Sequence, residues 1–156
     1  MRMNYKEKVE DFLNRGLIKK QEINFIQIEK HILRAYKDLK VAKINLTIDE
    51  EVAYNYAYLA MLRCARGLLF LKGFRPSDGQ QHKTVIEIVY SILGKNFKDL
   101  IEKFDRMRRK RNQFTYDPFL PVSKEEAENA LKSAENFLKK VSEFIKKETP
   151  QQKFNF

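Results

Sequence analysis

Six residues, Arg106 to Arg111, carry five cations in the order RMRRKR and are followed directly by Asn112. Six helical residues span more than one and a half turns, so these side chains do not all share one exposed face. Arg111 follows Met107 by four residues, which places it at the edge of the apolar side of a helix. A guanidinium there requires a partner or an anionic ligand, and a phosphate held by two parallel hydrogen bonds suits it.

A plainer interpretation of the same stretch is a solvated helix C-terminus, where cations complement the helix dipole. We expect Asn112 to end this helix, and we expect Arg106, Arg109 and Lys110 to point to solvent. Both interpretations fit the residues, and only Arg111 separates them, because its helical position is the one nearest the buried side.

The two histidines differ in their surroundings. His31 lies beside the apolar stripe of a long helix, so we interpret it as a partly buried structural residue. His82 lies in a polar loop just before a helix, where an imidazole can titrate near neutral pH. The single cysteine, Cys64, lies on an apolar seam with no cationic motif around it, so we expect a buried, structural thiol.

Composition narrows the class of protein. The chain has 156 residues, 31 Lys and Arg against 21 Asp and Glu, and a formal charge of +10. That excess favours a polyanionic partner such as RNA or a nucleotide. The sequence has no Gly-rich phosphate loop and no cluster of metal ligands, so we expect neither a cofactor nor a metal. It also has no signal peptide and no apolar run near the roughly 20 residues of a membrane span. We therefore expect a cytoplasmic protein without a membrane partner.

Helical periodicity dominates the chain, and no segment alternates with period two. Amphipathic helices are predicted over 4–14, ending at Gly16, and over 21–42. The most apolar helix follows a capping box formed by Thr47 and Glu50, and its small-residue seam predicts a central position. That seam comprises Ala53, Ala57, Ala60, Cys64 and Leu68.

The segment GFRPSDGQQH, at 73–82, is predicted to be a loop, followed by a helix that stops at Gly94. Another helix begins near Phe97, and a second capping box, Ser123 with Glu126, starts the last one. The prediction is an all-α antiparallel bundle of about four long helices plus one or two short ones. We expect residues 1–148 to form a single domain and residues 149–156 to form a frayed tail.

Taken together, "GFRPSDGQQHKTVIE" and "RRKRNQFTY" resemble the HEPN family of helical domains, in particular small prokaryotic members of toxin–antitoxin type. The resemblance covers about residues 45–145. It implies a homodimer and, in active members, a metal-independent ribonuclease whose motif is Arg, a polar residue, three further positions and His. Carried across, Arg111 takes the arginine role and Asn112 the polar role. Tyr116 stands where the histidine would be, so His82 is the candidate for the missing imidazole.

The resemblance implies an RNA-directed toxin with a nucleotidyltransferase-type antitoxin as partner. A phenol has a reference pKa of about 10 and is a poor base at pH 7, so Tyr116 favours binding over cleavage. The alternatives are a non-catalytic dimeric module that binds nucleotide, RNA or a partner enzyme, and an interaction scaffold without a ligand. The residues expected to contact RNA or nucleotide are Arg75, Arg106, Arg108, Arg109 and Lys110.

Overall fold

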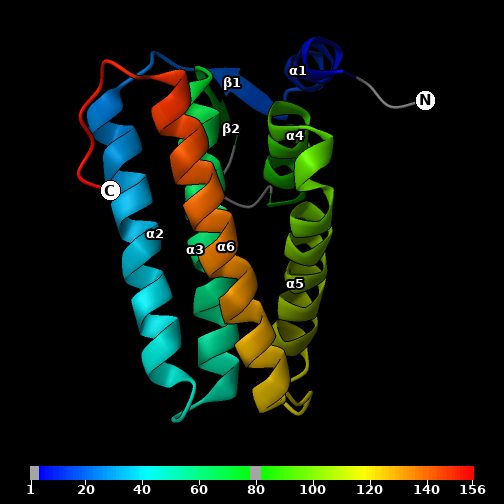
Figure 1. The fold of residues 1–156 in the computed structure, drawn as a ribbon. Coiled ribbons are helices and arrows are strands. Elements are labelled where there is room, and N and C mark those ends of the chain that lie inside the picture. Colours follow the sequence, from blue (N-terminus) through cyan, green and yellow to red (C-terminus); the bar gives the residue numbers. More distant parts are fainter. Residues whose placement is uncertain (1–3, 78–81) are drawn as a thin grey trace.

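The computed structural model describes residues 4–77 and 82–156 (Figure 1). Four long helices lie side by side, and successive ones run in alternating directions, which confirms the predicted all-α bundle. The long helices are α2 (Phe25–Asn45), α3 (Glu50–Leu71), α5 (Lys98–Tyr116) and α6 (Lys124–Glu148). The shorter elements are α1 (Tyr5–Asn14), α4 (His82–Leu93), the 3₁₀ turn η1 (Lys95–Phe97) and the strands β1 (Ile18–Lys20) and β2 (Phe74–Pro76).

Helix α3 occupies the centre, packed between α2 and α6 (Figure 1). Its predicted seam is buried along its whole length, and Cys64 is fully enclosed. Gly67 continues the seam, and a Cβ added there would come within 2.9 Å of Ile32 Cδ1 on α2. The absence of a side chain therefore lets α2 approach α3 closely, as small residues at a helix contact do.

Local signals explain most helix starts. The predicted capping box of Ser123 and Glu126 is confirmed at the start of α6, and Asn4 with Glu7 forms another at α1. The box predicted from Thr47 is wrong, because the N-cap of α3 is Asp49, whose side chain accepts from the Val52 N–H at 3.1 Å. Residues 46–48 instead form the turn that closes α2, which leaves Thr47 outside the helix start.

The prediction that Asn112 ends its helix is also wrong. Helix α5 continues to Tyr116 because Phe114 extends its apolar stripe by another turn. Phe114 is buried and packs edge-on against Tyr54 of α3, with ring centroids 5.8 Å apart. The helix stops at Asp117, just before Pro118, which disfavours helical backbone in the residue preceding it.

The small antiparallel sheet was not predicted from the sequence. Its register pairs Ile18 with Pro76, Lys19 with Arg75 and Lys20 with Phe74. Three residues per strand are too few for alternation to be recognised. Part of the predicted loop at 73–82 is therefore strand, and its middle, residues 78–81, lies outside the described residues.

The last eight residues, expected to be frayed, run beside α2 (Figure 1), and Phe154 and Asn155 contact this helix. The backbone N–H and the side-chain amide of Asn155 donate to the Glu29 carboxylate at 3.1 and 2.9 Å. The ring centroids of Phe154 and Phe25 are 6.3 Å apart. Phe156 stacks on Phe154, with ring centroids 4.8 Å apart. The aromatic residues supply apolar area that the polar neighbours in this segment lack.

Candidate functional site

A cavity of about 620 Å³ lies between the start of α4 and the last turns of α5. We call it the Arg111 cavity. Its basic and polar lining includes His82, Arg108, Arg111, Asn112 and Tyr116. Arg108, Arg111 and Asn112 share one side of α5 because residues three or four apart lie over one another on a helix. His82, the first residue of α4, meets them from the facing element. The structure thus brings together all four residues of the predicted motif, including the substitute imidazole.

Arg111 is half-buried and is held by contacts with α3. Its Nε donates to Asn55 Oδ1 at 3.1 Å, and its guanidinium carbon lies 5.8 Å from the centroid of the Tyr58 ring. Among the described residues, no carboxylate forms an ion pair with Arg111. A cation positioned by an amide and a ring keeps its full charge for a ligand, and its terminal nitrogens provide the usual donor pair for phosphate.

His82 is anchored by Tyr58 of α3. The Tyr58 hydroxyl and His82 Nδ1 are 2.8 Å apart, and either atom can be the donor. Burial, the largest cause, and the cations of Arg66, Arg111 and Arg108 together lower the pKa of His82 to about 4. The imidazole is therefore neutral at pH 7, and its Nε2 is not engaged by this contact.

Tyr58 links the two candidate residues, because it hydrogen-bonds to His82 and lies under the Arg111 guanidinium. Its side chain is fully buried, and burial raises its pKa well above the ordinary value, so the phenol stays protonated. Tyr58 was not among the residues predicted from the sequence, because it lies within the apolar helix. The available signal was the hydroxyl itself, since a buried tyrosine usually has a hydrogen-bond partner.

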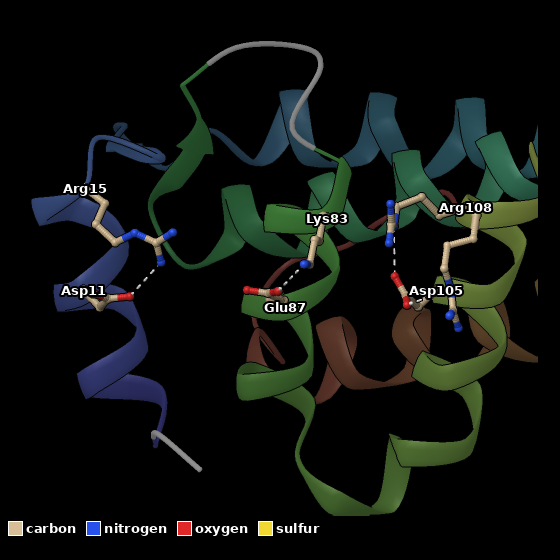
Figure 2. A network of polar contacts seen from close by, with 7 residues as sticks. Asp11, Arg15, Lys83, Glu87, Asp105 and Arg108 are labelled. Carbon is tan, nitrogen blue, oxygen red and sulfur yellow. Dashed lines mark hydrogen bonds and ion pairs between the residues drawn. The ribbon is translucent and has the colours of Figure 1, made fainter. Parts of the chain in front are cut away.

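Acidic partners neutralise some of the cations in and near the Arg111 cavity (Figure 2). Arg108 Nε donates to Asp105 Oδ1 at 2.9 Å, and Arg109 Nε lies 3.5 Å from Oδ2 of the same carboxylate. On α4, Lys83 forms a longer pair with Glu87 at 4.0 Å. Arg108 is nearly enclosed, with 16% of its side chain exposed, whereas Arg109 is 61% exposed. Arg111 is therefore the cavity cation with no such acidic partner among the described residues.

Other predicted residues lie elsewhere. Arg75 is exposed on β2 and does not line the Arg111 cavity. Arg106 is exposed, as expected, but it faces a different groove together with Lys110. The prediction that Lys110 points to solvent is wrong, because its Nζ lies 3.2 Å from Glu126 Oε2 and donates to the Pro121 carbonyl at 3.2 Å. The capping box that begins α6 positions this carboxylate beside the lysine.

The remaining sequence candidates have structural surroundings. His31 packs edge-on against Phe70 at 4.7 Å, its Nδ1 is 3.0 Å from the Gln27 carbonyl, and burial lowers its pKa. Burial raises the pKa of the Cys64 thiol, as expected for an unreactive core residue. Within residues 4–77 and 82–156, no three His, Cys, Asp or Glu side chains are arranged to hold a metal ion. No helix in the same ranges has the length and apolar character that crossing a membrane requires.

Comparison with known families identifies the domain. A family model described as the HEPN domain matches residues 28–145. The chain belongs to the HEPN family. The matched span runs from α2 to α6 and contains both His82 and the Arg111 motif. No curated protein matches the chain significantly. In this HEPN domain, Arg111, Asn112 and Tyr116 of α5 line the same cavity as His82 of α4.

Proposed function

We propose that this HEPN protein is the toxin of a toxin–antitoxin pair, which binds RNA in the Arg111 cavity and cleaves it without a metal. The observation that carries the proposal is that His82 and Arg111 line one cavity and share Tyr58 as a partner. Cleavage of RNA needs charge stabilisation at a phosphate and a group that moves protons. These two side chains supply both functions.

Arg111 holds the scissile phosphate. A guanidinium donates two parallel hydrogen bonds to phosphate oxygens and stabilises the negative charge that builds there as the 2′-oxygen attacks. Arg108 adds a second, partly neutralised cation on the same side of α5. Asn112, exposed at the cavity edge, can bond to a sugar or phosphate oxygen.

His82 moves the protons. With Nδ1 protonated and donating to the Tyr58 oxygen, Nε2 is free to accept the ribose 2′-hydroxyl proton. The 2′-oxygen then bonds to phosphorus, the bond from phosphorus to the 5′-oxygen breaks, and the imidazolium returns its proton to that oxygen. The products are a 2′,3′-cyclic phosphate and a 5′-hydroxyl. An anionic phosphate beside the three arginines offsets their effect and raises the pKa of His82 towards neutrality when RNA is bound.

Tyr116 has a separate role in this proposal. Its side chain is 88% exposed at the rim of the cavity, so it is placed for contact with RNA or a second subunit rather than for proton transfer. The HEPN family commonly pairs around this motif, and we infer a homodimer whose interface includes Tyr116. A nucleotidyltransferase-type antitoxin and a cytoplasmic location complete the proposed role.

One observation favours a second candidate, a non-catalytic module that binds RNA or nucleotide in the same cavity. A histidine whose pKa lies near 4 is a weak base at pH 7, and general-base efficiency falls when the pKa lies far below the working pH. The two candidates differ in one readout. Single-stranded RNA incubated with the protein and a chelator should yield 2′,3′-cyclic phosphate ends, and the His82→Asn variant should bind RNA but lack this product. Binding by the parent protein without any cleavage would select the module instead.

A further inference from the structure

A second, larger concavity lies between α5 and α6, on another side of α5 from the Arg111 cavity. It measures about 690 Å³, and we call it the α5–α6 groove. Four cations line it, Lys103, Arg106 and Lys110 from α5 and Lys132 from α6. The single lining carboxylate, Glu126, is already paired with Lys110 at 3.2 Å. The groove thus presents three exposed cations without an acidic lining partner, which favours an anionic ligand.

The floor of the groove argues against a purely apolar partner. Tyr54, Leu100, Met107 and Ala130 form it, but each is at least nine-tenths buried. The large hydrophobic residues exposed in the described ranges, such as Ile26 and Ile48, lie elsewhere. A docking helix requires exposed apolar anchors in its groove.

The polar lining of the groove suits nucleic acid. The α6 side contributes the amides of Asn129 and Asn136 and the hydroxyl of Ser133, which can donate to and accept from bases or sugars. Burial raises the pKa of Tyr54 to about 12, so its phenol stays protonated at neutral pH. Neutral donors and acceptors among cations are the combination that binds a phosphodiester strand.

Helix α5 lines both the α5–α6 groove and the Arg111 cavity, on different sides. Arg106 and Lys110 lie on the α6 side of α5, whereas Arg108 and Arg111 lie on the α4 side. Arg109 falls between these faces on the solvent side and is 61% exposed. A helix with its side chains is about 10–12 Å wide, so a strand of a few nucleotides can cross it.

We propose that the α5–α6 groove binds phosphates of the single-stranded RNA whose scissile phosphate occupies the Arg111 cavity, with the strand crossing α5 over Arg109. This inference rests on the proposed RNA-directed function. It defines the substrate as a strand long enough to reach both concavities, and it assigns Arg106 and Lys132 to binding at a distance from the reacting phosphate.

The test compares two fluorescein-labelled probes by anisotropy, a single-stranded RNA of about 12 nucleotides and a dinucleotide. The groove variant is Arg106→Ala with Lys132→Ala. Its matched control is Lys37→Ala with Lys40→Ala, which removes the same charge from exposed positions of α2. For the longer RNA between about 50 and 200 mM salt, the groove variant should lower the slope of log affinity against log salt by about 1.4, since each phosphate contact contributes about 0.7. The control pair should change this slope little, and neither pair should alter dinucleotide binding.

The outcomes separate the two proposals. Equal behaviour of the groove variant and the control pair towards the longer RNA would overturn the inference, and so would an equal loss for both probes. Arg111→Ala tests the cavity independently, because it should weaken binding of the dinucleotide as well. If Arg111→Ala binds the dinucleotide normally while the groove variant loses its salt slope, the cavity assignment fails and the groove assignment stands.

Discussion

Replacing Arg111 by alanine should separate a functional arginine from a structural one. Its partners in the fold are one amide oxygen, on Asn55, and the face of Tyr58. A net hydrogen bond contributes about 0.5–1.5 kcal/mol, and a cation over a ring at a partly exposed site about 0.5–1 kcal/mol. The expected loss is therefore about 1–2.5 kcal/mol, or about 2–10 °C in Tm for a chain of this length.

Arg63 provides a contrast to the small loss of stability expected for Arg111→Ala. Asp38 is 1% exposed and is bonded to Arg63 and, at 3.4 Å, to Arg34. Arg63→Ala leaves this buried carboxylate with one distant partner, and breaking such a buried pair costs about 3–5 kcal/mol. Thermal melts should therefore rank Arg63→Ala well below Arg111→Ala in stability. The reverse order would mean that Arg111 compensates a buried charge.

Activity towards RNA, in contrast to stability, should depend strongly on Arg111. RNA affinity and cleavage are measured for Arg111→Ala, for Arg111→Lys and for Arg15→Ala as the matched control. Arg15 also makes one hydrogen bond, to Asp11 at 3.2 Å (Figure 2). It makes one ring contact, to Phe12 at 5.7 Å, but it lies outside the cavity lining. Both Arg111 variants should lose about 100-fold or more in cleavage rate, because a point charge does not reproduce a two-pronged donor. Full activity in Arg111→Ala, or equal losses in it and Arg15→Ala, would refute the reasoning.

The surroundings of single residues support four further predictions. In an NMR titration of the parent protein, the His82 ring should have its midpoint near pH 4. The midpoint should be higher in Arg111→Ala, because this variant lacks a nearby cation. A midpoint at or above pH 6.5 in the parent would contradict this. The unfolded chain binds the His82 proton near pH 6.5, and the folded chain binds it only near pH 4. The Tm should therefore decline as the pH falls from about 6.5 to about 4, and less steeply in His82→Asn. Equal slopes in the parent and the variant would refute this linkage. Cys64 should resist a thiol reagent until denaturant is added, and rapid labelling of the folded protein would show the burial to be wrong. Light scattering at tens of micromolar protein should give twice the chain mass of 18.6 kDa, with Tyr116→Ser shifting it towards monomer; a parent monomer would disprove the dimer.

The helical bundle could be predicted from the sequence because each long helix carries its own periodic stripe. The central position of α3 followed from its small-residue seam, and the buried state of Cys64 followed from the same pattern. The end of α5 could not be placed, because Asn112 is a common helix terminator and the stabilising contact of Phe114 is with Tyr54, 60 residues earlier in the chain. Such long-range packing overrides a local signal.

The candidate site was predictable in part. Spacing alone placed Arg111 at the edge of the buried side, and its half-buried position agrees. The approach of His82 could not be deduced, since it depends on how α4 folds back against α5. The role of Tyr58 and the separation of Arg106 and Lys110 into another groove also depend on which helices flank α5. A helical stripe indicates which face is buried, but not which element covers it.

The most direct test of the central claim is the chemical nature of the RNA ends that the purified protein generates in the presence of a chelator. The account predicts 2′,3′-cyclic phosphate and 5′-hydroxyl ends from the parent protein, and a loss of about 100-fold or more in both His82→Asn and Arg111→Ala. Intact RNA after prolonged incubation with the parent protein, or undiminished cleavage by either variant, would contradict it.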